Sequence, residues 1–229
     1  MTTNSLHLRH TVSTPKAGAT RTRDLLELVL GYGLIIGIIW SPESAQAILT
    51  PVALALTLGV VLVRRPSRDD LGFGRRGLVQ SLWILPAAVA LSALSVLVAA
   101  KLGTLHPLYK PDPGHVIGYV LWTIYQQFLL QDYFMDRLLH LGVSSSLAVI
   151  VAGILFSAAH MPNLALVAAT LVWGIVCCAL FRRYHNIWML GLAQGLLGLC
   201  FALCVPDSLH HHLRVGLGYL RYHHAVRVR

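Results

Sequence analysis

Long apolar stretches separated by short polar breaks dominate the pattern along the chain. A run of about 20 apolar residues can cross the hydrocarbon core of a bilayer as a helix. The breaks hold charged residues or prolines, which end such runs. The predicted helices lie at about 24–41, 77–100, 115–141, 144–160 and 187–205, with a second span that ends at about 63 and a sixth that ends at about 181. The pattern therefore predicts an all-α integral membrane bundle of seven or eight transmembrane helices, in one domain over 24–206.

The two ends of the chain differ from this apolar middle. Residues 1–23 are polar and basic and contain no acidic residue, which predicts a flexible N-terminal tail. Residues 207–229 are rich in His and Arg, and their apolar positions follow a helical spacing. This end is therefore predicted to form a basic amphipathic C-terminal tail at the membrane interface. Its apolar stripe consists of Leu213, Leu217 and Leu220.

Composition strengthens the membrane prediction. The chain is 56% hydrophobic and only 12% charged, whereas soluble domains carry roughly 25% charged residues. Its net charge of +9 comes from Lys and Arg in the connections and tails, where the positive-inside tendency and anionic lipids explain them. We therefore expect membrane lipids as partners and no nucleic acid. The arginines of the 64–76 loop favour a cytoplasmic N-terminus and an inner, or plasma, membrane location.

Polar side chains within a span are costly and mark a functional site by default. Of the nine acidic residues, only Asp132 and Asp136 are predicted to lie deep in a helix. A spacing of four residues places Gln127 and Gln131 on one face of that helix, with the two aspartates on a neighbouring stripe. An alternative places Asp136, with Arg137 and His140 beside it, at a solvated cytoplasmic helix end.

Two further polar residues mark other predicted spans. His160 closes one span just before a proline, where a histidine also occurs as a capping residue. Gln194 is the strongly polar side chain of the last span, where an amide can simply bond a neighbouring helix. All four cysteines lie in apolar segments without C-x-x-C spacing, so they give no metal or redox signal.

The order of these positions on successive spans resembles the CPBP family, the CAAX-protease and bacteriocin-processing intramembrane proteases. That family has Glu-Glu-x-x-x-Arg, Phe-x-x-x-His and His-x-x-x-Asn helices. Phe156 and His160 match the second motif. The first motif carries glutamine at its three polar positions, and the third has Gln194 and Gly198. The resemblance covers about residues 70–200 and implies a CPBP-type core with a site within the bilayer.

The replacements change what this site can do. In the family, a glutamate is thought to activate water with the help of histidines. A glutamine amide neither accepts a proton at neutral pH nor binds a hard metal ion strongly. We therefore expect family-type peptide hydrolysis to be modified or lost, with no metal and no cofactor. The predicted catalytic positions are Gln126, Gln127, Gln131, Asp132, Asp136, His160 and Gln194.

Two other functions fit the same residues. One is a membrane-embedded enzyme that acts on an apolar isoprenoid lipid, with Asp132 or Asp136 as the acid. The other is a non-catalytic binding or immunity protein for a membrane peptide or lipid. A prenylated or isoprenoid substrate would contact aromatic side chains, which are also typical of ordinary packing. The predicted substrate-binding positions are Trp122, Tyr125, Phe128, Tyr133, Phe156 and Asn163.

Overall fold

The computed structural model describes residues 19–64, 66–108 and 112–222, and the regular structure in these ranges is entirely helical. The predicted all-α bundle is thereby confirmed. The helices are α1 (Ala19–Ile39), α2 (Glu43–Arg64), α3 (Leu78–Ser81), α4 (Ile84–Leu102), α5 (Pro113–Phe128), a π-helical segment (Leu129–Met135), α6 (Asp136–His140), α7 (Ser145–Ala158), α8 (Leu164–Tyr184), α9 (Ile187–Cys204), α10 (Asp207–His210) and α11 (Gly216–Leu220). The first helix begins before position 24, and most of the predicted flexible tail lies outside the described residues.

Side-chain caps fix where three of these helices begin. The carboxylate of Asp112 accepts a hydrogen bond from the backbone N–H of His115, and Pro113 occupies the first turn of α5. Asn163 and Asn186 cap α8 and α9 in the same way through their side-chain oxygens. Each cap satisfies a backbone donor that the first turn of a helix leaves free. The polar breaks of the sequence therefore determine the helix starts.

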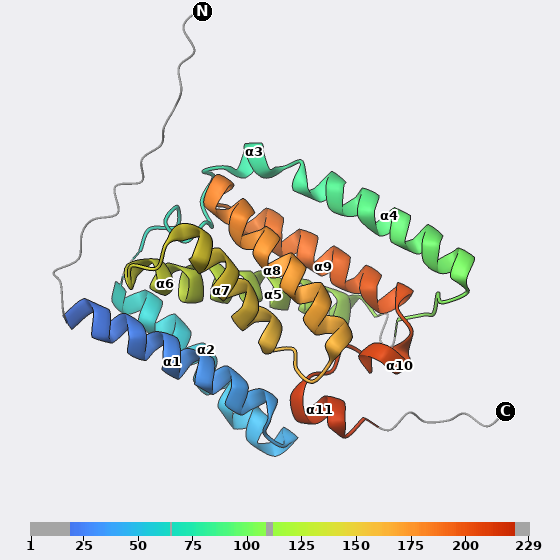
Figure 1. Ribbon diagram of the computed structural model, residues 1–229, viewed down its shortest axis with the longest axis horizontal. Coiled ribbons are helices and arrows are strands. Elements are labelled where there is room, and N and C mark those ends of the chain that lie inside the picture. Colours follow the sequence, from blue (N-terminus) through green and yellow to red (C-terminus); the bar gives the residue numbers. More distant parts are fainter. Residues whose placement is uncertain (1–18, 65, 109–111, 223–229) are drawn as a thin grey trace, which may run out of the picture.

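The helices form a bundle with a hairpin on one side (Figure 1). Helices α1 and α2 run together along one flank, α4 lies on the opposite flank, and α5, α7, α8 and α9 fill the space between them. Two glycines bring α7 and α8 together, since a Cβ at Gly174 would lie 3.2 Å from the Cα of Gly153. Small residues allow such close approach of helices in membrane proteins.

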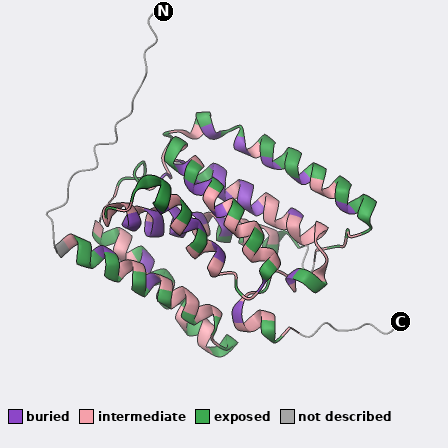
Figure 2. Ribbon diagram, in the orientation of Figure 1, coloured by how far each residue is buried: buried purple, intermediate pink, exposed green. Residues whose placement is uncertain are grey.

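Apolar side chains cover much of the outside of the bundle. On α2, Leu62 is 74% exposed, and on α4, Leu102 is 71% exposed, so both helices show largely exposed outer faces (Figure 2). Among the described residues, four helices are long and apolar enough to cross a membrane. They are Glu43–Arg64, Leu78–Leu102, Leu164–Tyr184 and Ile187–Cys204. The chain is a helical membrane protein, while seven or eight crossings remain a prediction.

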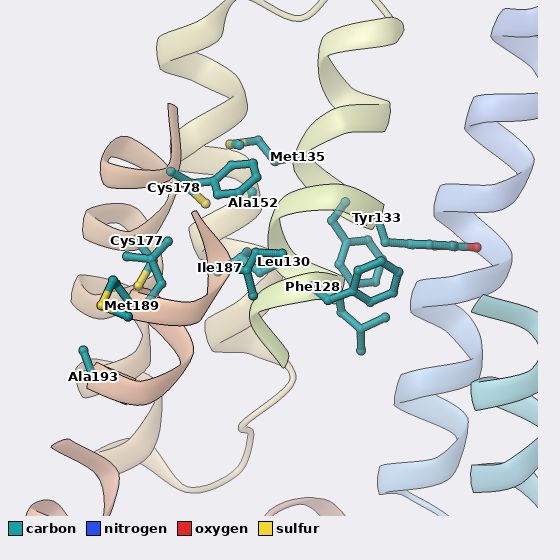
Figure 3. Close-up of a cluster of buried hydrophobic side chains, with 14 of the residues drawn as sticks. Phe128, Leu130, Tyr133, Met135, Ala152, Cys177, Cys178, Ile187, Met189 and Ala193 are labelled. Carbon is teal, nitrogen blue, oxygen red and sulfur yellow. The ribbon is translucent and has the colours of Figure 1, made fainter. Parts of the chain in front are cut away.

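The buried core lies where the π-helical segment meets α8 and α9 (Figure 3). Leu130 and Tyr133 project from the π-helical segment and are each 1% exposed. Cys177 and Cys178 of α8 are fully buried and free, and such thiols pack as small apolar side chains. This core holds the middle of the fourth predicted span firmly in place.

Three local features differ from the sequence prediction. The third predicted helix is interrupted at Leu82 and Trp83, because Pro86 four residues on has no N–H to bond the Leu82 carbonyl. The fourth contains a π-helical turn, which no periodicity signalled. The single amphipathic helix expected after position 206 is replaced by α10 and α11. Between them, His211, His212 and Leu213 have positive φ angles, which a right-handed α-helix does not accommodate.

Candidate intramembrane binding site

Close packing of α5 on α9 assembles the site. Gly191 and Gly195 face α5, and a Cβ at Gly191 would lie 2.8 Å from the Cα of Ile124. The hydroxyl of Thr123 donates a hydrogen bond to the Gly191 carbonyl at 2.9 Å. Because both glycines lie on one face of α9, the residue just before Gly195 is carried against α5. That residue is Gln194.

Four glutamines of α5, the π-helical segment and α9 form a continuous relay of hydrogen bonds. Gln131 Nε2 donates to Gln127 Oε1 at 3.0 Å, and Gln127 Nε2 donates to Gln194 Oε1 at 2.5 Å. Gln194 Nε2 then donates to Gln126 Oε1 at 2.6 Å. Gln127 and Gln131 are at most 1% exposed. We refer to these four side chains as the glutamine relay.

A tryptophan fixes the direction of the glutamine relay. Trp173 Nε1 lies 3.3 Å from Gln194 Oε1, and an indole N–H can only donate, so the atom that it contacts must be the amide oxygen. The nitrogen of Gln194 therefore faces Gln126. Gln127 Nε2 also donates to the sulfur of Cys177 at 3.3 Å. Three helices, α5, α8 and α9, thus meet at one neutral network.

The relay forms part of the wall of a large cavity between the α1–α2 hairpin and the rest of the bundle. Its volume is about 990 Å³, at the upper end of the range for small-molecule sites. The side chains of Gln126 and Gln194 line it, as does His160 from the end of α7. No Asp, Glu, Lys or Arg of the described residues lines this cavity.

His160 has a defined tautomer at the cavity wall. Its Nδ1 lies 2.8 Å from the carbonyl oxygen of Phe156, and a carbonyl oxygen can only accept, so Nδ1 carries the hydrogen. In the neutral ring, Nε2 is then a bare acceptor. The ring packs edge-on against Phe156 at 5.0 Å between centroids. The cavity therefore has one basic nitrogen and no carboxylate to support it.

Tyr119 occupies the space that the third motif leaves open. A Cβ at Gly198 would collide with the hydroxyl of Tyr119, so an asparagine at this position would require the tyrosine side chain to shift. Tyr119 lines the cavity and was missed by the sequence analysis. The only sign of it in the sequence is indirect. Gly198 stands where the third motif has the larger asparagine, so a neighbouring side chain is free to fill that volume.

The other predicted site residues divide into two groups. Trp122, Tyr125 and Phe156 line the cavity. Phe128 and Tyr133 belong to the packed core instead. Asn163 is fully buried away from the cavity lining, where its side-chain nitrogen donates to the carbonyls of His210 and Arg214. Neither Asp132 nor Asp136 lines the cavity.

A buried ionic cluster lies outside the cavity and joins α1 to α6. Arg137 is 2% exposed, and its Nη2 lies 3.0 Å from Glu27 Oε2, so the solvated helix end considered for Arg137 is wrong. Arg64 of α2 contacts both Glu27 and Asp24. The prediction that deep acidic residues lie only in the fourth helix is wrong, because Asp24 and Glu27 of α1 are also largely buried. The spacing of Asp24 and Glu27 at the start of an apolar run was the available signal.

Fold and site together define a polytopic α-helical membrane protein with a neutral polar site buried in its bundle. Residues 113–200 match the family described as Type II CAAX prenyl endopeptidase Rce1-like. This segment contains all three motif positions, so the predicted resemblance to the CPBP-type family is confirmed there. No curated protein and no solved structure matches the chain.

Proposed function

We propose that this chain is a non-hydrolytic membrane receptor that holds an apolar chain, built on a CAAX-endopeptidase-like scaffold. The observation that carries the proposal is the glutamine relay. It occupies the first and third motif positions, and three of its four amide nitrogens already donate to a neighbouring glutamine.

Hydrolysis of a peptide bond needs a base that activates water and donors that stabilise the developing charge. An amide does not take up a proton at neutral pH. The base available on the cavity wall is His160, whose Nδ1 is engaged by a backbone carbonyl rather than by an orienting carboxylate. A lone imidazole among amides and apolar side chains lacks the partner that a family-type water activation requires.

Acid catalysis on an isoprenoid lipid receives less support from the geometry. That hypothesis needs Asp132 or Asp136 in contact with substrate, and neither side chain lines the cavity. The side chain of Asp136 is instead 3.6 Å from His140. We therefore propose binding, of a membrane lipid or of the lipid part of a prenylated peptide.

The test places the protein in lipid nanodiscs and measures two quantities. The first is cleavage of a farnesylated reporter peptide, followed by mass spectrometry. The second is saturable retention of tritiated geranylgeranyl methyl ether, which carries an apolar chain and no charged head. We expect retention without cleavage. Cleavage that is lost in His160→Ala would overturn the proposal.

A pair of alanines on α2 supplies the matched control. Ala53 lines the cavity, whereas Ala55 is exposed and does not. Ala53→Trp should occupy part of the cavity and weaken saturable retention. Ala55→Trp should bind like the parent protein. Equal retention by the two variants would show that the cavity does not hold the geranylgeranyl chain.

A further inference from the structure

The cavity wall offers a small set of polar atoms that no described residue uses. Gln126 accepts from Gln194 through Oε1, and its Nε2 donates to none of the described residues. The Tyr119 hydroxyl and His160 Nε2 are likewise without a hydrogen-bond partner in the described part of the chain. All three residues line the same cavity. Several other polar side chains of the wall are engaged, as Tyr125 is with Thr57 at 3.0 Å.

These three groups have complementary chemistry. An amide N–H and a phenol O–H can donate, while His160 Nε2 can accept, because its Nδ1 holds the hydrogen. Two donors and one acceptor match the inventory of an alcohol, whose hydroxyl has two lone pairs and one hydrogen. An ether lacks the hydrogen, and a carboxylate or phosphate lacks it and adds negative charge.

Charge separates the possible ligands further. No Lys or Arg of the described residues lines the cavity. Bringing an anionic head group into an apolar site without a cation is very costly. The surrounding wall is formed mainly by leucine, isoleucine and aromatic side chains, including Trp122 and Phe201. A long apolar tail therefore fits the cavity, and its head group has to be uncharged.

Resting on the proposed function, we propose that the cavity binds an uncharged long-chain alcohol. The hydroxyl donates to His160 Nε2 and accepts from Gln126 Nε2 and from the Tyr119 hydroxyl. The apolar tail lies along the α1–α2 hairpin. An isoprenoid alcohol and a fatty alcohol share this head-group chemistry, and the experiment compares the two.

The experiment measures displacement of tritiated geranylgeraniol from the full chain in lipid nanodiscs. The competitors are unlabelled geranylgeraniol, oleyl alcohol, geranylgeranyl methyl ether and geranylgeranyl diphosphate. Because one neutral hydrogen bond is lost, we expect the methyl ether to bind about three- to tenfold more weakly than the alcohol. The diphosphate should bind at least about tenfold more weakly, since it adds unpaired charge.

Equal affinity for the alcohol and its methyl ether, or preference for the diphosphate, would overturn the alcohol proposal and leave the receptor proposal standing. If none of the long-chain ligands binds saturably, the receptor proposal itself is wrong. Displacement by oleyl alcohol as well as geranylgeraniol would support recognition of the hydroxyl on either tail. Displacement by geranylgeraniol alone would support an isoprenoid alcohol.

A variant connects the preference to the proposed atom. His160→Phe keeps an aromatic ring but removes the acceptor, so the ratio of alcohol to ether affinity should fall to about one. His115→Ala, on an exposed histidine outside this cavity, should keep the ratio of the parent protein. An unchanged ratio in His160→Phe would remove His160 from the proposal. The comparison of ligands on the parent protein tests the alcohol proposal even if this variant does not fold.

Discussion

At the scale of single residues, the glutamine relay replaces charge by a chain of neutral dipoles. Each member both accepts and donates except at the two ends. Buried amides of this kind are costly only when they lose a partner. Gln127 is the central member, since it accepts from Gln131 and donates to Gln194 and to Cys177.

Gln127→Leu should therefore lower the free energy of unfolding by about 1–3 kcal/mol, because it leaves two buried amides with unpaired groups. Thermal unfolding in mild detergent measures the change. Gln80→Leu provides the control, because Gln80 is exposed on α3 and the same substitution removes no buried bond. Equal effects of the two substitutions would contradict a cooperative relay.

At the scale of elements, the ionic cluster fastens the α1–α2 hairpin to the core. Glu27 lies at its centre and contacts Arg23, Arg64 and Arg137. The side chains of Glu27 and Arg137 are 12% and 3% exposed, whereas Arg23 is 48% exposed. Pairing with the buried arginine should therefore dominate, since an exposed ion pair contributes little.

Arg137→Gln should destabilise the fold by about 1–3 kcal/mol, because it removes the most buried of the arginines that pair with Glu27, while Arg64 stays in contact with it. The double variant Arg137→Gln/Glu27→Gln should lose less free energy of unfolding than the sum of the losses of the two single variants. The coupling free energy should be about 0.5–3 kcal/mol. Arg23→Gln should change stability by less than about 1 kcal/mol. Chemical unfolding in detergent micelles measures the four variants against the parent protein. Additive single effects would argue against a tie between α1 and α6.

A second element-scale attachment holds the segment after α9. His210 is 1% exposed, and its Nδ1 accepts a hydrogen bond from the backbone N–H of Leu213 at 3.1 Å. Its Nε2 therefore carries the hydrogen and donates to the Val205 carbonyl at 3.0 Å. Only the neutral ring can make both bonds. The adjacent left-handed turn depends on that ring.

Burial lowers the pKa of His210, although the nearby Asp207 opposes this shift and the rings of His106 and His212 support it. In the unfolded chain the ring has its ordinary pKa, about 6.5. The stabilising contribution is therefore complete above that pH and is lost as the pH falls through the lower folded pKa. We expect the Leu213 amide to exchange hydrogen faster at acidic pH, after correction for the intrinsic rate. His210→Gln should remove this pH dependence. If protection of the Leu213 amide in the parent protein does not change with pH, the prediction is wrong.

At the scale of the whole molecule, the side chains that line the cavity determine whether it can bind a metal ion. Catalytic zinc normally takes three protein ligands. Among the described residues there is no group of three or more His, Cys, Asp and Glu side chains placed to hold a metal ion, and His160 is surrounded by amides and apolar side chains. We expect treatment with 1,10-phenanthroline to leave both the melting temperature and chain retention unchanged. A fall in either that added zinc restores would contradict this expectation.

The sequence by itself determined the helices and the positions of the motifs. The lengths of the apolar runs predicted the main helices, because a hydrogen-bonded helix is the structure that lets such a run cross lipid. The spacing of four residues placed Gln127 and Gln131 on one face, and their side chains are bonded. Charged residues near the start of α1 were harder to interpret, because a helix end and a buried ion pair look alike in one sequence.

Only the tertiary structure decided which faces meet. Gly191 lets α9 approach α5 closely enough for Gln194 to enter the relay, and Tyr119 fills the volume above Gly198. Asp132, which looked like a member of the site, lies outside the cavity lining. These outcomes depend on the rotation and distance of helices relative to each other. Those quantities are set by contacts between residues far apart in the chain, which periodicity along one helix does not contain.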